Sequence, residues 1–229
     1  MIDSYILPTQ KRFLQPLANL LVRSRVSADN ITVVGFLVGL AAAPLLAFGH
    51  YGAALAVILI NRIFDGLDGA VARTSGPTDR GAYIDIAFDF FFYATIPFGF
   101  ALANPEQNAL AASALVAAFM GTGSSFLAFA TIAAKRGISA DAYPQKGIYY
   151  LGGLAEGAET IAAFAAMCIW PDHFAAIAWS YAAICMVTTV TRWRQGWVVF
   201  SEKEPEKNVR NAAGTRPTRE DQNSLREPS

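Results

Sequence analysis

The residues Asp65-Gly-Leu-Asp68-Gly69-Ala-Val-Ala72-Arg73 carry two carboxylates three positions apart, and Gly81, Asp85 and Asp89 follow at intervals of four. On helices, these spacings place the two carboxylates of each pair on one face. Only seven residues separate Arg73 from Gly81, so we expect two antiparallel neighbouring helices whose carboxylates converge. Four carboxylates in apolar surroundings are costly, so we expect a divalent cation or a charged substrate to compensate them.

The rest of the chain is apolar enough for a bilayer. Its 229 residues are 54% hydrophobic, and the mean hydropathy is +0.33. The formal net charge of zero gives no general attraction to nucleic acid. Apolar runs of about 20 residues predict an all-α integral membrane protein with six transmembrane helices. Their approximate ranges are 31–50, 51–72, 81–103, 109–134, 147–170 and 174–200.

Lysine and arginine lie before the first run, after the last, and in the second and fourth connections, but not in the other three connections. The positive-inside rule therefore predicts that both termini and the Asp stretch face the cytoplasm, as in an inner-membrane protein. Residues 1–26 are expected to form a juxtamembrane amphipathic helix, with a packed cytosolic helix as the alternative. Residues 27–200 form the predicted six-helix catalytic domain, and the polar residues 201–229 a disordered cytoplasmic tail.

The carboxylates define an all-oxygen site, which suits Mg²⁺, Mn²⁺ or Ca²⁺ better than zinc. Four of them suffice for two bridged ions. Gly66 and Gly69 leave the helix bare for close approach of a ligand, and Arg73 offers a fork to phosphate oxygens. The residues alone leave open a structural polar network or an ion path. Cys168 and Cys185 are expected to be buried, inert thiols.

The stretch resembles the signature of the CDP-alcohol phosphotransferases, or CDP-alcohol phosphatidyltransferase family, Asp-x2-Asp-Gly-x2-Ala-Arg-x8-Gly-x3-Asp-x3-Asp. All eight specified residues are present, with a gap of seven in place of eight after Arg73. The resemblance implies that Asp65, Asp68, Asp85 and Asp89 bind Mg²⁺ or Mn²⁺, as two ions, and that Asp89 is also the general base. It implies that Gly69, Ala72, Arg73 and Gly81 contact the CDP group, and it implies homodimers. Asn30 and Thr32 resemble a further nucleotide-contacting segment, although Asn30 equally fits a helix N-cap.

The implied reaction transfers a phosphatidyl group from CDP-diacylglycerol to a small alcohol and releases CMP. Lys135, Arg136, Arg192 and Arg194 are candidates for binding an acceptor phosphate, or simply set the topology. Glu156 and Glu159 share a face of the expected fifth span and are candidates for binding serine, ethanolamine, choline or inositol, or for hydrogen bonds within the protein. The alternatives are transfer from a soluble CDP-aminoalcohol to diacylglycerol, and a non-enzymatic carrier. The apolar run after Asp89 disfavours the carrier.

Overall fold

The computed structural model describes residues 3–138 and 153–201, and within them the secondary structure is entirely helical, as predicted. The elements are α1 (Asp3–Arg23), α2 (Ala28–Leu40), α3 (Ala42–Ala47), α4 (Tyr51–Ser75), α5 (Asp79–Ala103), α6 (Pro105–Lys135), α7 (Gly157–Ile169), the 3₁₀ turn η2 (Pro171–His173) and α8 (Phe174–Ser201). The predicted tail lies almost wholly outside the described residues.

Helices α2, α5 and α6 begin after residues whose side chains accept a backbone N–H from the first turn. Ser27 caps α2 in this way, Thr78 caps α5, and Asn104 caps α6 just before Pro105. Helix α4 ends at Ser75 and is followed by Gly76, whose φ of 97° lies in the left-handed region that favours glycine. A turn of three residues then reverses the chain into α5, so α4 and α5 run antiparallel.

Four segments are long and apolar enough to cross a membrane, by length and composition: Ala28–Ala47, Asp79–Ala103, Pro105–Lys135 and Pro171–Ser201. They correspond to the first, third, fourth and sixth predicted spans. Helix α4 matches the second span in position and has 25 residues, but charged side chains interrupt it. Helix α7 has 13 residues and begins at Gly157, later than the predicted start of the fifth span, and residues 147–152 lie outside the described residues.

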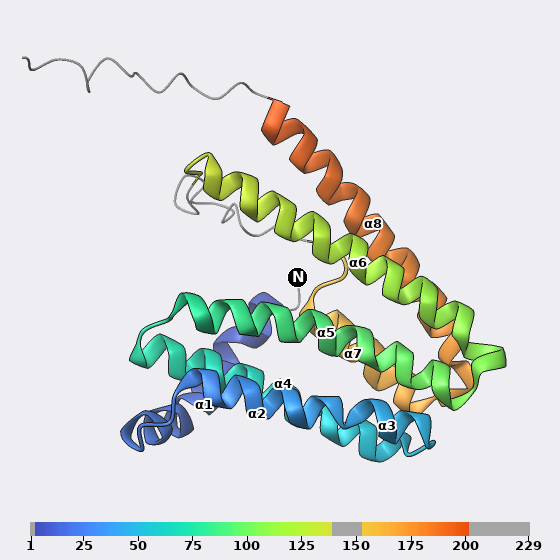
Figure 1. Cartoon of the computed structure of the whole chain (residues 1–229), viewed down its shortest axis with the longest axis horizontal. Coiled ribbons are helices and arrows are strands. Elements are labelled where there is room, and N and C mark those ends of the chain that lie inside the picture. The colour runs from blue at the N-terminus through green and yellow to red at the C-terminus, as the bar shows by residue number, and fades with distance from the viewer. Residues whose placement is uncertain (1–2, 139–152, 202–229) are drawn as a thin grey trace, which may run out of the picture.

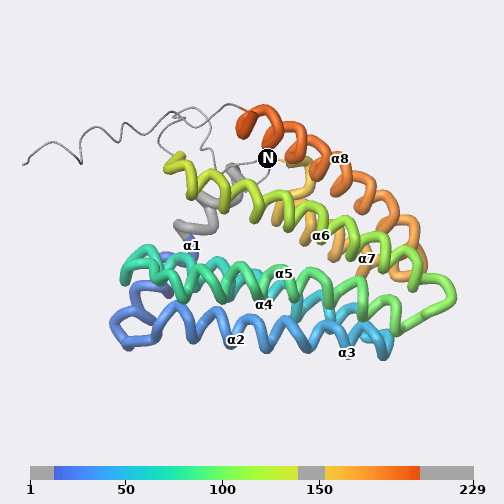
Figure 2. The backbone as a smooth tube through the Cα atoms, turned by 45° about the horizontal axis from the view of Figure 1, so that its top comes forward, coloured from blue at the N-terminus to red at the C-terminus, as the bar shows by residue number. Residues whose placement is uncertain are grey.

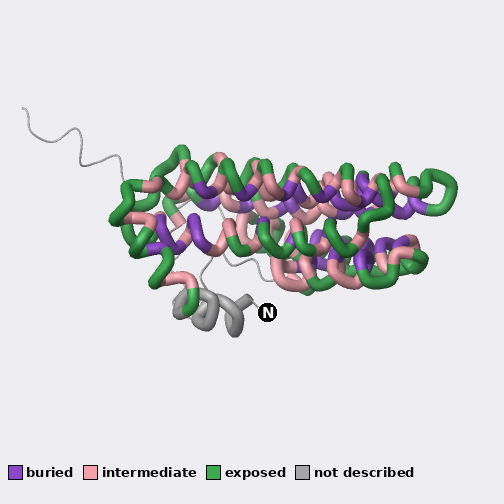
Figure 3. Tube along the Cα trace, turned by 90° about the horizontal axis from the view of Figure 1, so that it is seen from below, coloured by how far each residue is buried: buried purple, intermediate pink, exposed green. Residues whose placement is uncertain are grey.

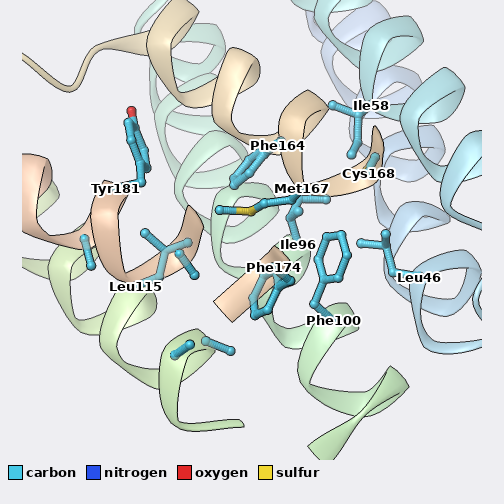
Figure 4. Close-up of a cluster of buried hydrophobic side chains, with 14 of the residues drawn as sticks. Leu46, Ile58, Ile96, Phe100, Leu115, Phe164, Met167, Cys168, Phe174 and Tyr181 are labelled. Atoms are coloured by element: carbon cyan, nitrogen blue, oxygen red, sulfur yellow. The ribbon is translucent and has the colours of Figure 1, made fainter. Parts of the chain in front are cut away.

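Helices α2 and α3 form one nearly continuous rod beside α4 and α5, and α6 and α8 pack together obliquely to these (Figures 1 and 2). Helix α7 contacts both α4 and α8. Buried residues lie on the faces that the helices turn toward one another (Figure 3). The main core contains Leu46, Ile96, Phe100, Met167 and Phe174 (Figure 4), at the opposite ends of the helices from the Asp stretch.

Helix α1 packs on the Asp-containing half of α4. Ala18 is fully buried in a second apolar cluster with Ile31, Leu67 and Val71. The apolar side chains Phe13, Leu17 and Leu20 on α1 are exposed and recur at helical spacing. One face of the helix therefore packs on the protein, and an apolar strip remains at its surface. That this strip lies on the membrane stays a prediction.

Candidate functional site

The four aspartates meet where the second half of α4 faces the first half of α5. One carboxylate oxygen each from Asp65, Asp85 and Asp89 lies within 4.8 Å of the other two. Asp68, one turn along α4, is buried, and its Oδ2 accepts a hydrogen bond of 2.6 Å from Thr32 Oγ1 on α2. All four line one narrow cavity. The predicted convergence of the two pairs is therefore present in the structure.

This donor set fits a hard divalent cation. Each of the three clustered aspartates is partly buried, and each offers an oxygen at a separation that one ion can bridge. Among the described residues no histidine or cysteine joins the group, which agrees with an oxygen site for Mg²⁺ or Mn²⁺. Asp68 stands beside this set, with one oxygen already engaged by Thr32.

Sequence reasoning missed Arg62, which reaches into the same cluster from α4. Its Nη2 lies 2.8 Å from Asp89 Oδ1, and its Nη1 lies 3.6 Å from Asp65 Oδ1. The Asn61 side chain accepts from Arg62 Nε and Nη2 at 2.9 and 2.6 Å. The signal was available, because a single arginine inside an apolar run, three residues before an aspartate, needs a partner.

A cavity of about 500 Å³ opens beside Asp68 and Asp85, between the starts of α2 and α5 and the end of α4. Of the residues expected at the nucleotide, Thr32, Gly69, Ala72 and Gly81 line it. Asn30 and Arg73 are exposed and are not among its lining residues. The Asn30 backbone N–H instead bonds to the Ser27 cap, and the Arg73 guanidinium lies back toward Gly69.

An ion pair at this cavity was also not foreseen. Arg80 Nε donates to Asp29 Oδ2 at 2.7 Å, which ties the first turn of α5 to that of α2. Gly81 lies next to this ion pair, and a Cβ on Gly81 would lie 2.9 Å from Asp29 Oδ1 and 3.0 Å from Thr78 Oγ1. The signature glycine thus permits the close approach of these two helix starts.

A second cavity, of about 380 Å³, opens on the other side of Asp89 between α5, α6, α7 and α8. Of the candidate acceptor residues, Glu156 and Arg192 line it, together with Tyr93 and Thr160. Arg192 Nη1 donates to the Thr122 carbonyl at 3.1 Å.

The remaining acceptor candidates are not among the residues lining this cavity. Glu159 lies in the first turn of α7, whereas Glu156 precedes that helix and accepts a hydrogen bond from the Gly153 N–H, so the two do not share a helical face as expected. Lys135 and Arg194 are exposed. Arg136 bonds to the Phe200 carbonyl, which joins the ends of α6 and α8.

The chain is similar in sequence and in structure to known proteins. Inner membrane protein YnjF of Escherichia coli K12 is 51% identical over 200 residues, covering 87% of this chain and 97% of its own length. The crystal structure of Mycobacterium tuberculosis phosphatidylinositol phosphate synthase (PgsA1) with CDP-DAG bound has a TM-score of 0.59 at 25% identity, covering 81% of this chain and 94% of that one. The same enzyme in complex with manganese and citrate gives the same TM-score and identity over 80% of this chain and 88% of that one. The sequence model of CDP-alcohol phosphatidyltransferase matches residues 25–193, and this chain therefore belongs to the CDP-alcohol phosphatidyltransferase family.

Proposed function

We propose that this protein is a membrane enzyme that transfers a phosphatidyl group from CDP-diacylglycerol to a small alcohol and releases CMP. The observation that carries the proposal is the position of Asp89, whose side chain belongs to the carboxylate cluster and also lines the cavity on its far side. The larger cavity, beside Asp68 and Gly69, suits the cytidine diphosphate, and the smaller one suits the acceptor. The CDP-DAG complex of the related PgsA1 supports the choice of donor.

Asp65, Asp85 and Asp89, with Asp68 beside them, would hold Mg²⁺ or Mn²⁺, and we expect two ions. Bound divalent ions would neutralise charge on the diphosphate and on the departing CMP. The complex of PgsA1 with manganese and citrate supports a divalent metal in this protein. Thr32 holds Asp68 by its short hydrogen bond and keeps this carboxylate turned toward the cavity.

Asp89 would act as the general base. The acceptor hydroxyl would give its proton to the Asp89 carboxylate as its oxygen bonds to the phosphorus that carries the diacylglycerol. The bond from that phosphorus to the bridging oxygen would break, and CMP would leave with the oxygen. Within the described residues, no serine, cysteine or histidine lines the carboxylate cavity, which favours direct in-line displacement.

The acceptor cavity offers charges of both signs, from Glu156 and Arg192, and hydroxyls from Tyr93 and Thr160. This lining suits a small polar alcohol that carries further hydroxyl or charged groups. The PgsA1 enzymes are named phosphatidylinositol phosphate synthases, so phosphorylated and unphosphorylated polyols are the first acceptors to test.

We further propose that α4 and α7 complete six spans, with both termini and the site on the cytoplasmic side of the inner membrane. Helix α4 is as long as its antiparallel neighbour α5, which is apolar enough to cross. The relative named as an inner membrane protein supports this location. A homodimer is the expected assembly, which cross-linking in the membrane tests.

The deciding experiment uses the purified chain in lipid nanodiscs with CDP-diacylglycerol and Mg²⁺. Alcohols, amino alcohols, inositol and phosphorylated polyols are screened for release of CMP. Release with one acceptor class identifies the substrate and supports the proposal. No release with any acceptor, but release from CDP-choline in the presence of diacylglycerol, would replace the proposed reaction by the soluble-donor alternative.

A further inference from the structure

We propose that Arg62 is an internal counter-ion of the carboxylate cluster that competes with divalent cations at Asp65 and Asp89 and so weakens the affinity of the site for metal. This inference rests on the proposed metal site and adds a residue outside the signature to it. Arg62 also contacts Asp89, the carboxylate assigned as the base.

The guanidinium is held in place by contacts on several sides. Asn61 Oδ1 accepts two of its N–H groups, and Asn61 Nδ2 in turn donates to the Gly35 carbonyl at 2.8 Å, which anchors the pair to α2. The Arg62 guanidinium carbon lies 5.0 Å from the centroid of the Phe92 ring and 5.4 Å from that of Tyr93. With so many partners, the side chain cannot leave the cluster without losing several contacts at once.

The position of Arg62 makes it a competitor for the metal ligands. Its Nη2 engages Oδ1 of Asp89 and its Nη1 approaches Oδ1 of Asp65, and both aspartates belong to the three that can ligate an ion together. A divalent cation at the same carboxylates therefore lies close to a fixed positive charge. The side chain of Arg62 is only 17% exposed, so water screens this repulsion incompletely.

The same contacts are compatible with a purely structural role, in which Arg62 only fastens α4 to α5. The two roles predict opposite effects on metal binding. If the role of Arg62 is structural, its removal would disorder the carboxylate cluster and weaken the binding of metal. Loss of a competing charge would strengthen it, because the carboxylates remain and the repulsion is gone.

The test is Mn²⁺ binding to the nucleotide-free protein in nanodiscs, followed by electron paramagnetic resonance of the free ion. We expect Arg62→Gln to bind Mn²⁺ about tenfold more tightly than the wild type, and Arg62→Lys, which keeps the charge, to stay within about threefold. Arg80→Gln is the matched control, because it removes an arginine whose partner is Asp29 rather than the cluster. We expect its Mn²⁺ affinity to equal that of the wild type.

Unchanged or weaker Mn²⁺ binding by Arg62→Gln, with clear binding by the wild type, would overturn this inference and leave the proposed function standing. Absence of Mn²⁺ binding by the wild type would overturn both. If Arg62→Gln does not fold, Asp89→Asn is compared with the double variant Asp89→Asn/Arg62→Gln. Position 89 is uncharged in both, so the loss of the arginine leaves no unpaired charge at that position. Tighter binding by the double variant supports the competition, and equal or weaker binding overturns it.

Discussion

Replacing Thr32 by valine tests whether α2 controls the catalytic cluster through one hydrogen bond. Valine has nearly the shape of threonine and lacks the hydroxyl that donates to Asp68 Oδ2 at 2.6 Å. The same oxygen lies 3.1 Å from the Ala28 carbonyl, but a hydroxyl has one proton, and the shorter contact to a carboxylate is the stronger bond. The substitution therefore removes a charge-assisted hydrogen bond at a buried carboxylate and changes little else.

The size of the effect follows from the partner. Hydrogen bonds to charged groups contribute about 1.5–3 kcal/mol, and Asp68 is only 6% exposed, so water does not readily replace the lost donor. If this loss of free energy falls on the transition state with CDP-diacylglycerol bound, kcat/KM for CDP-diacylglycerol falls by about tenfold to a hundredfold. Thr32→Ser keeps the hydroxyl and is expected to stay within about threefold of the wild type.

The assay is CMP release in nanodiscs at saturating acceptor and varied CDP-diacylglycerol, with Mn²⁺ binding measured in parallel. We expect Thr32→Val to retain Mn²⁺ binding, because Asp65, Asp85 and Asp89 are untouched. Wild-type kcat/KM in Thr32→Val would refute the reasoning. Equal losses in the serine and valine variants would show that packing around Thr32, rather than its hydroxyl, is what matters.

Three further predictions follow from other parts of the molecule. Asp89→Asn should abolish CMP release while CDP-diacylglycerol still binds, as measured by ligand-induced thermal stabilisation; retained turnover would exclude Asp89 as the base. Chelation by EDTA should stop CMP release and added Mg²⁺ or Mn²⁺ should restore it, whereas activity that persists in EDTA would argue against a divalent metal at the aspartates. Gly99→Ala should lower the free energy of unfolding by about 1–3 kcal/mol in a denaturation titration, because its Cβ would lie 2.9 Å from both the Ala43 carbonyl and Leu46 Cβ. Gly52→Ala, in open space on α4, is the control and should not destabilise the protein.

The convergence of the aspartates could be predicted because much of it follows from local geometry. Spacings of three and four place each pair on one helical face, and the short turn makes the two helices antiparallel. Helix α2, which packs on both α4 and α5, completes the arrangement that brings Asp65 and Asp85 together. The hydrogen bond from Thr32 to Asp68 depends instead on how α2 packs against α4, and sequence periodicity does not give this register. Spacing placed Glu156 and Glu159 on one helical face, but α7 begins only at Gly157, and Glu156 lies just before it.

The seven-residue gap illustrates how the structure absorbs a departure from the family pattern. Thr74 and Ser75 still belong to α4, and Asp79 and Arg80 already belong to α5, so only residues 76–78 form the turn. The left-handed backbone of Gly76 and the cap at Thr78 close this short turn, and Gly81 lines the larger cavity.

Arg62 was not predicted although it contacts Asp89, the proposed base, because its position depends on contacts between helices. The signature constrains residues whose positions follow from the α4–α5 turn, whereas Arg62 depends on Asn61, on Gly35 of α2 and on two aromatic rings of α5. Three helices must be in register before this guanidinium reaches Asp89. The carboxylates therefore form a pattern that can be read along the chain. The sequence also marks Arg62 as a charge that needs a partner, but only the packed fold shows that Asp89 is that partner.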